Sequence, residues 1–165
     1  MRRVEGFTAY VERRRAHLFR AAYLLCGDAH RAEDLVQTTL TKLYVHFPRV
    51  AGAANADAYA RRVLVNSHVD ETRRPWRRER SYAELPDRAA DSGLDPEQAD
   101  ELWAALRALP AGQRRVVVLR HYWGLSVEET AGDLGISTGT VKSQTSLALA
   151  ALARALRTDV TRGER

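Results

Sequence analysis

The chain has 165 residues, a formal net charge of +5 and an apolar fraction of 45%, which suffices for packed cores in one ordinary domain or two small ones. Its single cysteine, Cys26, excludes an internal disulfide and a cysteine-rich zinc site and is typical of a reducing compartment. The N-terminal segment lacks an apolar stretch long enough for a signal peptide or a membrane span. We therefore expect a cytoplasmic protein that does not engage a membrane.

Charge is distributed unevenly along the chain. Residues 1–60, 61–80 and 103–165 carry an excess of basic side chains, whereas residues 81–102 are strongly acidic. Basic segments on both sides of an acidic segment are typical of two domains that bind nucleic acid and are joined by a linker that does not bind it. This pattern predicts two small domains joined by a flexible acidic linker.

Helical periodicity runs through the first half of the chain. Apolar residues recur at helical spacing over residues 7–26 and again over residues 30–47, and Asp28 stands where it can cap the second helix. A third helix is predicted from about residue 57 to residue 74, before Pro75. Because no alternating pattern typical of a useful β-strand appears anywhere, we predict an all-α fold.

The second half begins after the predicted linker. Pro96 stands where the first position of a helix is expected, and this helix is predicted to end at Leu109. A further helix is predicted over residues 113–122, with the apolar run 116–119 deeply buried. The last helix is predicted to end at about Arg157.

Residues 127–146 have the pattern of a helix-turn-helix. Ala131 is a small residue where the two helices would cross, and Gly135 stands where the turn requires a positive φ. Ser126 and Glu129 have the spacing of a capping box, and Ser137 stands before the second helix as its cap. The second helix of such a motif enters the DNA major groove, whereas the alternative interpretation is a plain helical hairpin.

The outward side of that second helix carries small polar residues. If Val141, Ala148, Leu152 and Leu156 face inward, the opposite side near the start of the helix presents Thr138, Lys142, Ser143 and Ser146. Backbone N–H groups at the start of the helix are also available to a phosphate.

Two further segments allow a functional and a structural interpretation. Arginines gather in residues 61–80 around Trp76. They could bind a single-stranded nucleic acid, with the arginines contacting phosphates and the tryptophan stacking on a base. Alternatively, they form a solvated basic face and the tryptophan packs in the core. Residues 32–37, AEDLVQ, either complement the helix dipole or form a docking face for another protein.

Signals of catalysis are missing from the sequence. The five histidines are scattered, with no pair at metal-ligand spacing, and there is no glycine-rich phosphate loop and no serine or cysteine nucleophile motif. We therefore expect a protein that is not an enzyme and holds no metal or cofactor.

Three motifs, in this order, resemble bacterial sigma-70-type initiation factors of the extracytoplasmic-function (ECF) group, in particular its sigma-E-like actinobacterial subfamily. RAEDLVQTTLTKLY (31–44) is similar to the region 2 helix that binds core polymerase. YARRVLVNSHVDETRR (59–74) is similar to the helix that opens and reads the −10 promoter element. Residues 108–152 resemble region 4, which reads the −35 element.

The resemblance implies a division of labour. Region 2 would occupy residues 1–80, the linker residues 81–98 and region 4 residues 99–158. Region 2 would dock on the clamp helices of the largest polymerase subunit through Asp34, Leu35, Gln37, Thr38, Leu40 and Tyr44. Single-stranded −10 DNA would meet Arg61, Arg62, Asn66, Asp70, Arg73, Arg74 and Trp76. Region 4 would sit on the β-subunit flap and contact −35 duplex through Ser137, Thr138, Thr140, Lys142, Ser143, Gln144 and Ser146.

The same resemblance implies association with the nucleoid and admits an anti-sigma factor as a partner. One departure from the family pattern concerns the recognition helix, where typical members carry basic groups near Gln144, Leu147 and Ala151. Here Lys142 is the only cation before Arg154. We therefore expect weak −35 binding by the chain alone, because each lost phosphate contact lowers affinity and flattens its salt dependence.

Two other functions remain as alternatives. Residues 125–143 also resemble the C-terminal domain of two-component and quorum-sensing activators, which makes a stand-alone transcriptional regulator the second hypothesis. The first half of the chain, however, has neither a receiver nor a ligand-domain pattern. The third hypothesis is a helical adaptor that binds only protein.

Overall fold

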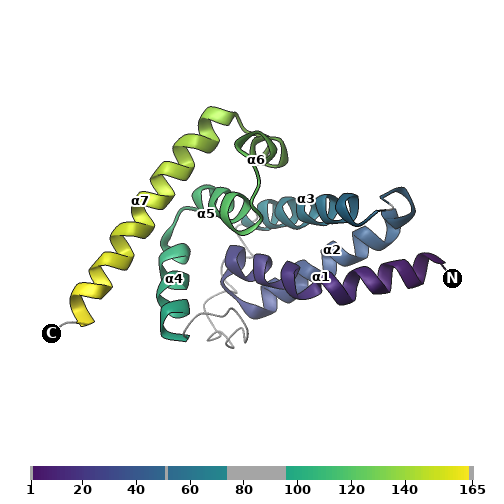
Figure 1. The fold of residues 1–165 in the computed structure, drawn as a ribbon, viewed down its shortest axis with the longest axis horizontal. Helices are drawn as coiled ribbons and strands as arrows, with labels where there is room; N and C mark the ends of the chain where they lie inside the picture. Colours follow the sequence, from purple (N-terminus) through teal and green to yellow (C-terminus); the bar gives the residue numbers. More distant parts are fainter. Residues whose placement is uncertain (1, 51, 74–95, 164–165) are drawn as a thin grey trace. The chain divides into compact units, whose positions relative to one another are not determined.

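The computed structural model describes residues 2–50, 52–73 and 96–163. Within these ranges the chain is helical and contains no strand, which confirms the predicted all-α class (Figure 1). It divides into two compact units, Met1–Asp87 (unit 1) and Arg88–Arg165 (unit 2). Most of the predicted linker, residues 81–98, lies outside the described residues.

Unit 1 contains α1 (Arg2–Cys26), α2 (Ala29–His46), the short 3-10 helix η1 (Phe47–Arg49) and α3 (Ala53–Thr72). Asp28 caps α2 as predicted, since its carboxylate accepts hydrogen bonds from the backbone N–H groups of His30 and Arg31. The core between the three long helices consists of small and branched apolar side chains, among them Leu18, Leu25, Leu35, Leu43, Leu64 and Val65.

Two helices of unit 1 begin earlier than predicted. Helix α1 starts at Arg2 because its first turn is tied to the end of α2, where the Arg3 guanidinium donates to the carbonyl of Tyr44 and lies 4.4 Å from the centre of its ring. Helix α3 starts at Ala53 because residues 53–56, AANA, are mostly alanine, the best helix former. The sequence-based prediction began this helix only at about residue 57.

A polar contact joins α1 to the first turns of α3. One oxygen of Asp57 accepts hydrogen bonds from the Tyr10 hydroxyl at 2.8 Å and from Arg14 Nε at 2.9 Å. Burial, and next the Asp57 carboxylate, raise the pKa of Tyr10, so the phenol stays a neutral donor. The contact sets the position of α3 along α1.

Acid should destabilise unit 1 through His17. Burial, followed by the positive charge of Arg14, lowers the pKa of His17 below its ordinary value of 6.5, although Asp57 opposes the shift. The unfolded chain therefore binds this proton at a higher pH than the folded chain does. Stability from the neutral imidazole is complete above about pH 6.5 and is lost as pH falls towards the folded pKa.

Replacement of His17 by Gln should remove this part of the acid sensitivity. Urea unfolding of unit 1 between pH 7 and pH 5 would measure it, with the wild-type chain losing more free energy of unfolding than the variant. Equal losses in the two proteins would contradict the assignment.

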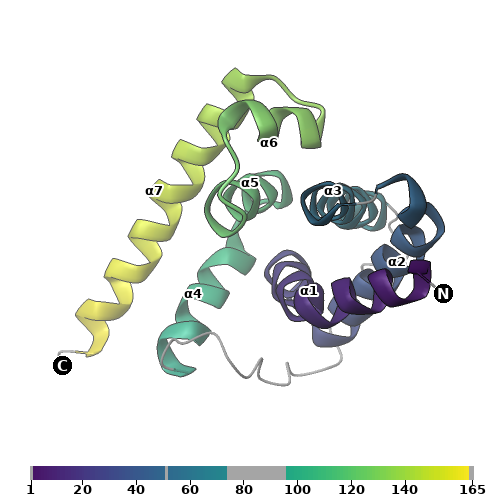
Figure 2. The ribbon, with the colours of Figure 1, turned by 45° about the vertical axis from the view of Figure 1, so that its right-hand side comes forward.

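Unit 2 contains α4 (Pro96–Ala108), α5 (Ala111–Val117), a turn of π-helix η4 (Val118–Tyr122), α6 (Val127–Leu134) and α7 (Thr138–Gly163). The helix predicted over residues 113–122 corresponds to α5 together with η4, and its apolar run 116–119 is buried as predicted. Helices α4, α5 and α6 pack along α7 (Figure 2). Helix α7 continues past Arg157 because no glycine or proline interrupts it before Gly163.

Candidate nucleic-acid interface

The helix-turn-helix of unit 2 is formed by α6, the turn and α7. The Ser126 hydroxyl accepts a hydrogen bond from the Glu129 N–H at 3.0 Å, and the Glu129 carboxylate accepts one from the Ser126 N–H at 3.3 Å. This completes the predicted capping box. Helix α6 ends at Leu134 and is capped by Gly135, which has φ 65° and ψ 34°, the left-handed conformation predicted for the turn.

A small apolar cluster holds the two helices at their crossing. Val116 of α5, Ala131 of α6 and Val141 of α7 are buried together, and Val127, Leu134 and Ile136 pack against them. Ala131 lets the helices approach because it has only a methyl group. The predicted inward positions of Val141 and Ala148 are confirmed, since both side chains are fully buried.

Two glycines of the motif should respond oppositely to alanine. Gly132 lies inside α6 with nothing within 4 Å of an added Cβ, so Gly132→Ala should raise the free energy of unfolding by up to about 1 kcal/mol. Gly135 has positive φ, so Gly135→Ala should lower it by about 1 kcal/mol. Thermal unfolding of the two variants checks the signs, and a stabilising Gly135→Ala would contradict the turn geometry.

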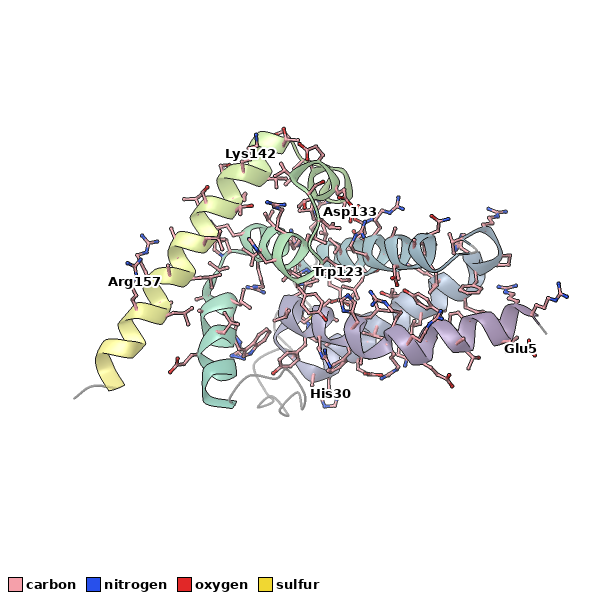
Figure 3. The ribbon with its side chains drawn as sticks, in the orientation of Figure 1. Glu5, His30, Trp123, Asp133, Lys142 and Arg157 are labelled. Carbon is pink, nitrogen blue, oxygen red and sulfur yellow. The ribbon has the colours of Figure 1, made fainter. Side chains whose placement is uncertain are left out.

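The start of α7 presents a polar surface. The Ser137 hydroxyl accepts a hydrogen bond from the Thr140 N–H at 3.1 Å and so caps the helix as predicted. Of the residues predicted to contact −35 DNA, Gln144 is half-buried, and the exposed ones are Ser137, Thr138, Thr140, Lys142, Ser143 and Ser146. Lys142 lies near the N-terminal end of α7, whereas Arg157 lies far along the helix (Figure 3).

Several basic side chains of unit 2 serve its own fold. The Arg114 guanidinium donates to the carbonyls of Leu106, Arg107 and Leu109 at 2.9–3.1 Å and thereby caps the C-terminal end of α4. Arg120 donates to the carbonyl of Leu125 at 2.6 Å, in the segment before α6. Net positive charge in this half of the sequence therefore overstates the charge that this unit offers to DNA.

A second polar surface lies on α3. Arg62, Asn66, Asp70 and Arg73 are exposed at spacings of four, four and three residues, which places them in one stripe along the helix, here called the α3 stripe. The opposite side carries the buried Ala60, Leu64 and His68. Arg61 is half-buried beside the stripe. The predicted contact residues Arg74 and Trp76 lie outside the described residues.

The outer side of α2 differs from its prediction. Asp34, Gln37, Thr38 and Tyr44 are exposed, but Leu35 and Leu40 are only 0% and 7% exposed because they pack in the core of unit 1. The prediction of these two leucines as contacts is therefore corrected. The apolar periodicity of α2 already contained this signal, because Leu35, Val36, Leu40 and Leu43 repeat at core spacing.

Sequence reasoning also missed Val45, which is 61% exposed beside Tyr44. The outward side of the helix, here called the α2 face, consists of Asp34, Gln37, Thr38, Thr41, Lys42, Tyr44 and Val45. Its last two residues, Tyr44 and Val45, are aromatic and apolar, whereas the rest of the face is polar.

Among the described residues, no three histidine, cysteine or acidic side chains are grouped so that they could hold a metal ion. None of the described helices is both long and apolar enough to cross a membrane.

Each of the two units matches a known protein-family model. Residues 10–78 match the family model for sigma-70 region 2, and residues 99–152 match that for sigma-70, region 4. The chain is 42% identical over 153 residues to an RNA polymerase sigma-E factor of Streptomyces avermitilis, covering 88% of this chain and 82% of the relative. It is 39% identical over 150 residues to the ECF RNA polymerase sigma factor SigL of Mycobacterium tuberculosis, covering 83% and 81%.

Solved structures show the same fold. The sigma factor RpoE of Bartonella quintana, in complex with the anti-sigma factor NepR, superposes with a TM-score of 0.70 at 28% identity and covers 86% of this chain and 91% of its own. CnrH, in complex with the cytosolic domain of CnrY, superposes with a TM-score of 0.62 at 24% identity, covering 93% and 88%.

Proposed function

The chain belongs to the ECF group of the sigma-70 family and is an RNA polymerase sigma factor, and from this we propose how its surfaces share the work of initiation. Unit 2 binds the −35 promoter element as duplex, and unit 1 captures the −10 element as single strand. The observation that carries the proposal is that the region 2 and region 4 matches fall on two compact units, each with an exposed polar stripe opposite its core.

At the −35 element, the first turns of α7 enter the major groove. Ser137, Thr138 and Thr140 surround the N-terminal end of the helix, where backbone N–H groups donate hydrogen bonds to a phosphate. Lys142, Ser143, Gln144 and Ser146 follow towards the bases. With Lys142 as the only cation from residue 138 to residue 153, the helix makes few phosphate contacts, and each adds about 0.9 to the salt slope. Affinity for the promoter is therefore supplied mainly by polymerase.

At the −10 element, the α3 stripe faces the unpaired strand. Arg62 and Arg73 neutralise phosphates, while the Asn66 amide offers both a donor and an acceptor to a base edge. Arg61, Asp70, Arg74 and Trp76 belong to the same proposed site, with Trp76 as a stacking platform for a flipped base.

The α2 face docks on the clamp helices of the largest polymerase subunit, and unit 2 rests on the β-subunit flap. Leu35 and Leu40 support the α2 face from the core rather than touching the partner, because both are buried. The contact consists of polar residues near Asp34 and an apolar end at Tyr44 and Val45.

An anti-sigma factor is also proposed as a partner, supported by the complex of the similar sigma factor RpoE with the anti-sigma factor NepR. The protein would act in the cytoplasm, on promoters of the nucleoid, and would itself carry out no catalysis.

Reconstitution tests the function as a whole. Core polymerase, the full chain and a DNA library randomised in the −35 and −10 elements should yield specific transcripts that are absent without the chain. Tight operator binding by the chain alone, with no effect of polymerase, would instead indicate a stand-alone regulator. Polymerase binding without any promoter-dependent initiation would indicate an adaptor.

A further inference from the structure

Two leucines stand exposed on the recognition helix. Leu147 is 56% exposed and Leu149 is 43% exposed, although most large apolar side chains of unit 2 are buried. In a helix, Leu147 lies one turn beyond Ser143 and two turns beyond Thr140, on their side, whereas Leu149 lies two turns beyond Lys142. Leu147 thus continues the side of Thr140 and Ser143, whereas Leu149 lies on a different side of α7.

Short side chains distinguish the side of Leu147. Thr140 and Ser143 allow the helix backbone to approach base edges, while the long Lys142 side chain suits the phosphates at the rim of the groove. An apolar side chain at this position has one apolar partner in the major groove, the 5-methyl group of thymine. The other bases have no apolar group on their major-groove edge that a leucine side chain could contact.

The hydrogen bonds made by hydroxyl groups of α7 also favour a base pair that contains thymine. The single hydroxyl proton of Ser143 is donated to the Thr140 carbonyl at 3.1 Å, and that of Thr145 to the Val141 carbonyl at 2.7 Å. In this arrangement the lone pairs of Ser143 remain available, and they can accept a hydrogen bond from the amino group of adenine or cytosine. An acceptor beside an apolar side chain fits a thymine–adenine pair.

We propose that Leu147 is a specificity residue that packs against the 5-methyl group of one thymine in the −35 duplex. The assignment rests on the proposed role of unit 2 in −35 binding and adds to it the base that this position selects.

Replacement of thymine by deoxyuridine tests the contact, because it removes the methyl group alone. Holoenzyme of the full chain and core polymerase first selects its promoter from DNA randomised in the −35 element. Each thymine of the selected −35 element is then replaced singly. At one position the wild-type holoenzyme should bind uracil DNA about fourfold more weakly, as expected for one buried methyl group.

The Leu147→Ala holoenzyme should bind DNA with thymine or uracil at that position equally well. The helicity of the variant should be unchanged, because alanine has the highest helix propensity and the position is exposed. Leu149→Ala is the matched control and should retain the fourfold preference. The proposal is overturned if the wild type selects no thymine, if it tolerates uracil everywhere, or if Leu147→Ala keeps the preference. Loss of the preference in Leu149→Ala alone would overturn it as well. If no promoter were selected at all, the proposed function itself would fail, and this assignment with it.

Discussion

Val141→Asp should abolish the cooperative unfolding of unit 2. The Val141 side chain is 0% exposed and packs in one cluster with Val116 and Ala131. The side chains of this cluster have no polar atom that could pair with a carboxylate. An unpaired charge at such a site costs more than about 4 kcal/mol, a large part of the stability of so small a unit. The helix-turn-helix would lose its crossing, and −35-dependent transcription would cease.

Circular dichroism during thermal unfolding would measure this effect. Leu149→Asp is the control, because it adds the same charge to the same helix at an exposed position, and it should change the free energy of unfolding of unit 2 by less than about 1 kcal/mol. Normal helicity and a normal unfolding transition in Val141→Asp would refute the inward position of this residue.

Tyr44→Ala should weaken binding to core polymerase by about 30-fold, the effect typical of a tyrosine hot spot. The Tyr44 ring is 38% exposed on the α2 face and is held in place from two sides. Phe7 contacts it edge-on at 5.0 Å between ring centres, and the Arg3 guanidinium lies over it. A side chain held in this way loses little conformational entropy on binding, so its contacts contribute almost fully to affinity.

Two variants separate binding from folding in this experiment. Tyr44→Phe keeps the ring and should bind polymerase nearly as well as the wild type. Tyr23→Ala removes a half-buried tyrosine near the other end of α1, where it stacks on Phe19, and should leave polymerase affinity unchanged. Equal affinities of Tyr44→Ala and wild type, measured by fluorescence anisotropy, would remove Tyr44 from the docking surface.

Local signals were sufficient for much of the fold. Asp28 before α2, the pair Ser126 and Glu129, and Gly135 in the turn each act within a few residues of their position in the sequence. Capping and positive φ are properties of adjacent backbone groups, so they were predicted correctly without any knowledge of packing. The same holds for the apolar spacing that placed Val141 inside.

Long-range contacts decided the rest. The start of α1 depends on Arg3 reaching Tyr44, and the basic charge of Arg114 is used on carbonyls of the preceding helix. Resemblance to a family likewise could not tell contact from core on α2, where Leu35 lies inside and Val45 outside.

By itself the sequence determined an all-α chain with a helix-turn-helix and the motifs of a sigma factor, because these depend on periodicity and on neighbouring residues. The tertiary structure alone decided which side chains stay exposed, including Val45 on α2 and Leu147 on α7. Exposure depends on the elements that pack against a helix, and those elements are distant in the sequence.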